Sequence, residues 1–327
     1  MGVTPFPNGI TSYGIPVFGG GVMSQGQAWF VKPRTGNNAN NGKSSDKAFK
    51  TLDKAQTMAV ANRNDVVYLF AESNTAADTT DYQSATLAWA KDLVHLVGVG
   101  APVNVSNRAR VAFLSTYDTA SNLFTLSASG CIISNISLFA GVAGTLPTGC
   151  MNVTGSRNFV SNCHIAGIGH ANNDINSAYS LQISAGQENL FSHCTIGVDT
   201  IARGTGANSE LRLVSAATRN KFENCDFTTY AEAAGHQFLI VGASGLDRYT
   251  KFENCNFINM PTGIASGTTM TEAFDVGATP GGLLLLKNCT MVGCDDWEAN
   301  VESAITFIDG GAPTNNTSGL AVLVEAT

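Results

Sequence analysis

The sequence has few charged residues and no long apolar run. Charged side chains make up 13% of the 327 residues, about half of their usual share in soluble domains. Helices exposed to water need Glu, Lys and Arg on their wet face, so this shortage disfavours a mainly helical protein. Apolar runs such as Leu283 to Leu286 are far shorter than the roughly 20 residues of a membrane-spanning helix. We therefore expect neither a helical bundle nor a membrane protein.

Positive charge is also scarce. Eighteen basic residues stand against 25 acidic ones, which gives a net charge of −7. Because no basic run or stripe is visible, we expect no nucleic-acid partner. The opening MGVTPFPNGI has neither a basic start nor a hydrophobic segment, so we expect no secretory signal. We expect the protein to be made in a cytoplasm.

Turn-forming and small residues are abundant instead. The chain has 34 glycines, and its 44% of hydrophobic residues is enough for a large core. This composition is typical of short strands joined by turns. A length of 327 residues would suggest two domains at about 150 residues each, but elongated all-β chains often exceed that size as one unit.

A heptapeptide recurs along the chain and marks a structural repeat. Its cysteine-containing copies are FVSNCHI (159–165), LFSHCTI (190–196), KFENCDF (221–227), KFENCNF (251–257) and LLKNCTM (285–291). Their cysteines are 31, 31, 30 and 34 residues apart, and a sixth copy, IISNISL (132–138), has Ile136 in the cysteine position. A short alternating strand precedes each copy. Units of about 30 residues without a helix bury their apolar face only by stacking, so we predict an all-β solenoid, specifically a parallel β-helix over residues 25–295.

The heptapeptide also predicts two columns of residues along this solenoid. In KFENCDF, a bend at Asn224 is needed to turn Phe222, Cys225 and Phe227 all inward. Asn tolerates the left-handed conformation of such a bend better than any residue except Gly. The predicted structural ladder consists of the bend residues Asn135, Asn162, His193, Asn224, Asn254 and Asn288 and the inward thiols Cys163, Cys194, Cys225, Cys255 and Cys289. We expect free thiols without disulfides, because in-register stacking rarely gives the required dihedral angle.

The two ends of the chain differ from the repeat. Residues 1–24 contain PFP, Pro16 and the glycines 19–21, which favour an extended arm. We expect a strand at Trp29–Val31, a helix over about 46–61 with Ser45 or Asp46 as its N-cap, and a buried strand at 66–70. The helix would cover the open end of the solenoid. Residues 296–327 contain two strand-like runs that would close the last coil or pair with another subunit.

Three segments near the start carry a resemblance to known proteins. NNGKS (40–44), AFKTLDKA (48–55) and NDVVYL (64–69) resemble the start of pectate-lyase-like right-handed β-helix proteins. Residues 85–111 and the opening TPFPNGITSYGIPVFGGG (4–21) are similar to segments of β-helical structural proteins of tailed bacteriophages. The resemblance implies a right-handed β-helix and a virion protein of the capsid decoration type.

This resemblance sets the expected partners and location. The arm would dock on the major capsid protein or other virion proteins through Pro5, Phe6, Pro7, Ile10, Tyr13, Ile15, Pro16 and Phe18. Phage β-helices commonly form homotrimers, so a homotrimer is implied. The protein would be assembled in the bacterial cytoplasm and reside on the capsid surface, without a membrane contact.

An enzymatic function was weighed against this structural role. Glycoside hydrolysis needs two carboxylates about 5–10 Å apart, and Glu223 and Glu253 occupy matching places in neighbouring coils. Because Lys221 and Lys251 accompany them, we interpret them as a charge-balanced surface. The histidines and cysteines lack metal-ligand spacing. We therefore expect no catalytic residue, no metal, no cofactor and no enzymatic activity. The alternative is a tailspike or tail fibre that binds or cleaves host polysaccharide, although 24 residues leave no room for the usual head-binding domain.

Overall fold

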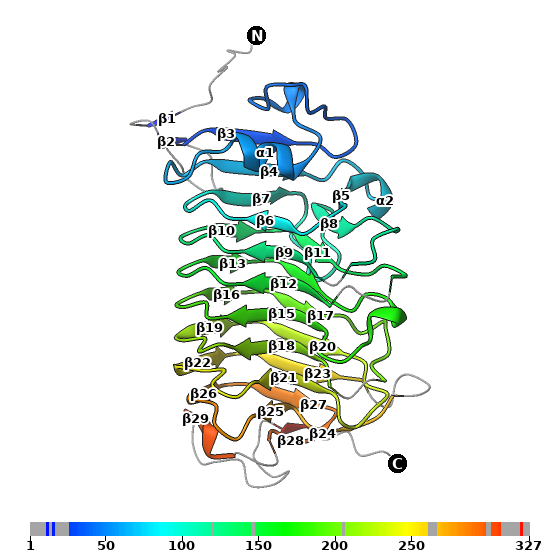
Figure 1. Ribbon diagram of the computed structural model, residues 1–327, viewed down its shortest axis with the longest axis vertical. Coiled ribbons are helices and arrows are strands. Elements are labelled where there is room, and N and C mark those ends of the chain that lie inside the picture. Colours follow the sequence, from blue (N-terminus) through cyan, green and yellow to red (C-terminus); the bar gives the residue numbers. More distant parts are fainter. Residues whose placement is uncertain are drawn as a thin grey trace, which may run out of the picture.

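The protein is an elongated parallel β-helix in the computed structural model (Figure 1). The structure describes residues 11–12, 15–16, 26–119, 121–144, 148–204, 207–260, 267–298, 302–308 and 321–322. The coils contribute strands to three sheets that run along the rod. Successive coils pair in parallel, with Phe191 opposite Phe222 and Phe222 opposite Phe252. The all-β solenoid predicted from the repeat is therefore confirmed.

Sheet 1 has ten strands and contains the first half of each heptapeptide. Its strands are β3 (Ala28–Val31), β4 (Val66–Phe70), β7 (His95–Val99), β10 (Ile132–Ser134), β13 (Phe159–Ser161), β16 (Leu190–Ser192), β19 (Asn220–Glu223), β22 (Arg248–Glu253), β26 (Gly282–Lys287) and β29 (Ile305–Phe307).

Sheet 2 has nine strands and follows the bend of each heptapeptide. Its strands are β5 (Thr80–Gln83), β8 (Arg110–Phe113), β11 (Ser137–Phe139), β14 (His164–Ala166), β17 (Thr195–Gly197), β20 (Asp226–Thr229), β23 (Asn256–Asn259), β27 (Thr290–Val292) and β30 (Ala321–Val322).

Sheet 3 has seven strands and contains the strand that precedes each heptapeptide. Its strands are β6 (Leu87–Trp89), β9 (Asn122–Leu126), β12 (Gly149–Val153), β15 (Tyr179–Ser184), β18 (Ser209–Val214), β21 (Gln237–Val241) and β25 (Phe274–Val276). Two small sheets pair β1 (Thr11–Ser12) with β2 (Ile15–Pro16) and β24 (Met270–Glu272) with β28 (Cys294–Asp296).

The core is one continuous apolar column inside the coils. Phe222, Cys225 and Phe227 are all fully buried, as the bend at Asn224 predicts. The ring centroid of Phe222 lies 4.7 Å from that of Phe191 and 5.0 Å from that of Phe252, in stacked geometry. Stacked rings repeat at the strand spacing of the sheet, so each aromatic position stabilises its neighbours along the rod.

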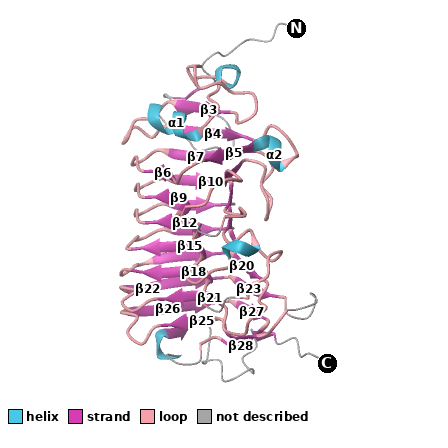
Figure 2. Ribbon diagram, turned by 45° about the vertical axis from the view of Figure 1, so that its right-hand side comes forward, coloured by secondary structure: helices cyan, strands magenta, loops and turns pink. Residues whose placement is uncertain are grey.

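The N-terminal end is capped by helix α1 (Leu52–Met58), which is shorter than expected (Figure 2). The cap of this helix is Thr51, whose side-chain oxygen accepts from the backbone N–H of Lys54. Residues 45–47 form a separate 3-10 turn, η1 (Ser45–Lys47). The predicted N-cap at Ser45 or Asp46 was wrong because Phe49 pairs with Val31 as an extended residue and separates η1 from α1. Two further 3-10 turns, η2 (Ala171–Asn173) and η3 (Glu302–Ala304), and the short helix α2 (Ala76–Thr79) lie in connections.

The C-terminal strands continue the coils of their own chain. Strand β29 pairs with β26, and β30 pairs with β27, both in parallel. In the described residues no helix is long and apolar enough to cross a membrane.

Candidate functional site

The bend residues between sheets 1 and 2 share one unusual backbone conformation. Asn135, Asn162, His193, Asn224, Asn254 and Asn288 have φ values of 57°, 51°, 54°, 52°, 53° and 50°. Asn tolerates this left-handed region with little strain, and His is also enriched there. The amide of Asn254 donates to Asn224 Oδ1 at 3.3 Å, so neighbouring coils contact each other through the bend column.

The thiols next to the bend are buried and free. Cys163, Cys194, Cys225, Cys255 and Cys289 form no disulfide and are at most 3% exposed. The thiol of Cys225 lies 3.6 Å from the backbone oxygen of Phe191 in the preceding coil. Burial raises the pKa of the Cys194 and Cys225 thiols well above the usual value. Such thiols are poor nucleophiles and poor metal ligands at neutral pH.

A second asparagine column was missed by the sequence reasoning. Asn158, Asn189 and Asn220 are buried where sheet 3 turns into sheet 1. The backbone N–H of Asn158 donates to Asn189 Oδ1, and that of Asn189 donates to Asn220 Oδ1, each at 3.0 Å. The signal was present, because these residues recur 31 apart just before the heptapeptides.

The Glu223 and Glu253 pair lies on the outer face of sheet 1. Lys221 Nζ contacts Glu223 at 2.7 Å and Glu253 at 3.0 Å, and Glu253 also contacts Lys251 at 3.0 Å and Lys287 at 2.9 Å. The three lysines, Lys287 first, lower the pKa of Glu253 to about 2, and Lys221 lowers that of Glu223. A catalytic acid needs a raised pKa instead. This geometry favours the charge-balanced surface.

A small polar cavity opens beside the bend column. The connection from β7 to β8 runs across the bends of later coils, since Ser106 N–H donates to His164 Nδ1 and the Asn107 amide donates to the Asn162 carbonyl, each at 3.0 Å. Below the tip of this connection lies a cavity of about 140 Å³. It is lined by Pro102, Val103, Asn104, Asn162, His193, Cys194, Thr195, Asn224 and Asp226.

This bend cavity brings together the imidazole of His193 and the carboxylate of Asp226. The two residues occupy different positions of the repeat, so the repeat alone does not predict that they are neighbours. His193 is exposed, and its Nδ1 lies 2.9 Å from the hydroxyl of Ser192, which donates to Glu223 Oε1 at 3.0 Å. Asp226 lies in the next coil, two residues after the bend residue Asn224 that matches His193. Its Oδ1 accepts from the Asn256 amide at 2.8 Å. Hydroxyl groups of a ligand would find both donors and acceptors here.

A larger cavity of about 330 Å³ lies at the N-terminal end. Its lining includes Arg34, Lys50, Asp78, Asp81 and Tyr82. The buried Asp81 accepts from the backbone N–H of Leu52 at 2.9 Å. Burial raises the pKa of Asp81 to about 7, against the opposing effect of that hydrogen bond.

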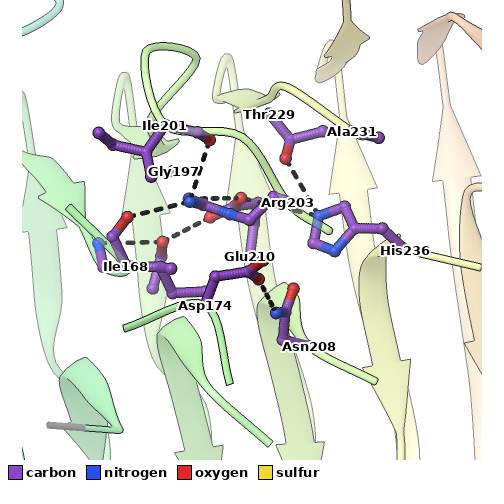
Figure 3. A network of polar contacts seen from close by, with 12 residues as sticks. Ile168, Asp174, Gly197, Ile201, Arg203, Asn208, Glu210, Thr229, Ala231 and His236 are labelled. Carbon is purple, nitrogen blue, oxygen red and sulfur yellow. Dashed lines mark hydrogen bonds and ion pairs between the residues drawn. The ribbon is translucent and has the colours of Figure 1, made fainter. Parts of the chain in front are cut away.

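A buried ion pair holds the long loops between sheets 2 and 3 (Figure 3). Arg203 and Glu210 are 0% exposed and 3.3 Å apart. Arg203 also donates to the carbonyls of Ile168 and Ile201 at 2.9 and 3.2 Å, and Ser180 donates to Glu210. Burial lowers the pKa of the neighbouring His236 well below its usual value, so this imidazole is neutral. No solvent reaches these side chains, so the cluster fixes loops rather than binding a ligand.

The docking residues of the arm lie mostly outside the described residues. Pro5, Phe6, Pro7, Ile10, Tyr13 and Phe18 belong to that group. Ile15 and Pro16 form β2, which pairs antiparallel with β1. The expected extended arm thus contains a short strand pair.

Comparison with known proteins identifies the fold. No family model and no curated protein matches the sequence. Among solved structures, a pectate lyase matches with a TM-score of 0.59 and 15% identity over 91% of this chain and 74% of that one. A rhamnogalacturonan lyase matches with a TM-score of 0.55 and 18% identity over 82% and 68%. A pectin methylesterase in complex with a hexasaccharide matches with a TM-score of 0.53 and 16% identity, over 91% of this chain and 92% of that one.

These matches correct the expectation that the chain is not an enzyme. That expectation rested on the missing column of carboxylates, but three solved structures of this fold are two lyases and an esterase. An in-phase acidic column is too narrow a criterion, because the bend cavity combines His193 and Asp226 from different places in the repeat. Enzymatic activity is therefore compatible with the fold. The chain has the pectate-lyase-like right-handed β-helix fold, a fold it shares with polysaccharide-acting proteins.

Proposed function

We propose that this protein decorates a bacteriophage capsid, with residues 1–24 docking on the shell and the β-helix projecting outward. One observation carries the proposal: β3 is the end strand of sheet 1. The segment that precedes β3 therefore joins the rod at its N-terminal end (Figure 1). An anchor at one end of a rod leaves the other end free to project.

The interior of the rod supports this role. Sheet 1 pairs the described coils from β3 to β29, sheets 2 and 3 pair the coils between β5 and β30 and between β6 and β25, and one continuous core fills the interior. Coils that pair through backbone hydrogen bonds along their whole length resist bending, because bending would break the ladders on one side. Such a body suits a projecting surface protein, and the sequence resemblance to tailed-phage structural proteins points to a virion.

Sedimentation with undecorated capsids of the encoding phage tests the proposal. We expect the full chain to pellet with capsids at saturating, stoichiometric amounts and a variant lacking residues 1–24 to stay in the supernatant. The matched control has residues 1–24 in shuffled order, which keeps composition and length. Equal binding by all three proteins would refute docking through the arm, and no binding by the full chain would refute decoration. Light scattering of the purified protein tests the homotrimer, which stays a prediction.

A second candidate function is binding or cleavage of host-surface polysaccharide, as in a tailspike or tail fibre. The bend cavity favours it, because His193, Thr195, Asn224 and Asp226 offer polar groups in a hollow of about 140 Å³. Binding and release of oligosaccharides from host glycans would be measured for the wild type, His193→Asn and Asp226→Asn. His193→Asn introduces the residue that the repeat itself uses at this bend, so the fold should persist. Asn288→His, far along the same column, is the control. Loss of glycan binding or of oligosaccharide release in the two cavity variants but not in Asn288→His would support the site.

A further inference from the structure

The charges of the chain are divided unequally between its two ends. Residues 1–25 contain no charged side chain, and residues 26–64 contain seven basic and two acidic ones, a net charge of +5. The rest of the chain contains eleven basic and 23 acidic residues, a net charge of −12. The overall charge of −7 hides this polarity, and so did the absence of a continuous basic run.

Six of these basic residues lie on one stretch of the chain at the N-terminal end of the rod, which we call the basic cap. The connection between β3 and α1 forms the N-terminal end of the rod (Figures 1 and 2). The cap is defined by the six basic side chains on this connection and on α1, namely Lys32, Arg34, Lys43, Lys47, Lys50 and Lys54. Four of them are exposed, while Lys32 and Lys54 are half-buried over the rings of Phe70 and Phe49.

The basic cap differs from the other cationic surfaces in its pairing. Across the described residues, none of its six side chains lies within 4.0 Å of a carboxylate oxygen. Lys221, Lys251 and Lys287, in contrast, all contact glutamates. Uncompensated like charges repel one another, and an oppositely charged partner removes that repulsion on binding. The pattern is therefore typical of a surface that binds something acidic.

We propose that the basic cap binds an acidic surface of the capsid shell, beside the site where residues 1–24 dock. This inference rests on the proposed decoration function and names the chemistry of its partner. The arm enters the fold through β3, and the cap follows β3 directly. Any surface that holds the arm therefore lies close to the cap. Nucleic acid is the competing partner for a basic surface, but single-stranded nucleic acid is usually held by several exposed rings. Tyr82 is the one aromatic residue in the described lining of the cavity beside Arg34 and Lys50, and the carboxylates Asp78 and Asp81 line the same cavity.

Neutralising the cap tests this proposal. The cap variant is Lys43→Gln/Lys47→Gln/Lys50→Gln, and the control is Arg157→Gln/Arg219→Gln/Arg248→Gln. Both remove three positive charges from exposed side chains far from the core. Circular dichroism checks that each variant folds. Affinity for undecorated capsids is measured at about 50 mM and about 200 mM salt, over which screening of exposed charges increases strongly.

We expect the cap variant to bind about tenfold more weakly than the wild type at low salt, because each exposed contact contributes modestly. The control should bind like the wild type, and salt should weaken the wild type more than the cap variant. Equal affinity of wild type and cap variant would overturn the inference and leave arm docking intact. No capsid binding by the wild type would instead refute decoration itself. Unchanged capsid binding with cap-dependent retention on a DNA fragment would assign the cap to nucleic acid.

Discussion

Glu210→Leu should destabilise the protein strongly, although this position touches no ligand. The substitution removes the carboxylate that faces Arg203 at 3.3 Å, in a place where both side chains are 0% exposed. The guanidinium would keep its bonds to the Ile168 and Ile201 carbonyls but lose its counter-charge. Removing one partner of a buried ion pair costs about 3–5 kcal/mol, mostly because the remaining charge is buried alone.

Urea unfolding followed by circular dichroism measures this cost. The informative comparison is the double variant Arg203→Met/Glu210→Leu, which removes both charges and keeps similar volume. Replacing a whole buried pair with apolar residues is often neutral, so the double variant should be more stable than Glu210→Leu alone. The reasoning would be refuted if Glu210→Leu cost less than about 1 kcal/mol, or if the double variant were no more stable than Glu210→Leu.

Three further predictions concern other parts of the rod. Burial raises the pKa of Asp81 to about 7, so the folded state holds a proton that the unfolded state releases near pH 4. The free energy of unfolding should therefore fall by about 2–3 kcal/mol from pH 5 to pH 8. Thermal unfolding of Asp81→Asn should not show this fall. Asn224→Ala, at φ 52°, should lose about 1 kcal/mol in urea unfolding while Asn224→Gly loses less, and equal losses would contradict a conformational role for this bend. All eight cysteines are buried and free, so a thiol reagent should label none of them in the native protein and all of them in denaturant; rapid native labelling of Cys225 would contradict the inward column.

The repeat made the fold predictable because its geometry is encoded locally. A residue suited to the left-handed bend recurs at 224, 254 and 288, and the cysteine that follows it turns inward in each of these coils. Stacking then follows from the need to bury the apolar face of each unit. The position of α1 was less predictable, since the pairing of Phe49 with Val31 is a tertiary contact that overrides helix propensity.

The candidate sites were harder to predict because they lie in the variable loops. The bend cavity depends on residues 102–104 crossing several coils to reach His193, and no repeat phase places that loop. Arg203 meets Glu210 through a loop between sheets 2 and 3 whose length differs from coil to coil. The basic cap was not predicted because its six basic residues are spread over residues 32–54 and form no continuous run.

Electron cryomicroscopy of capsids incubated with the full-length protein tests the central claim most directly. The account predicts a rod-shaped density at regular positions on the shell, with the β3 end and the basic cap against the capsid surface and β29 pointing away. A rod attached by its C-terminal end, or capsids without added density at saturating protein, would contradict it.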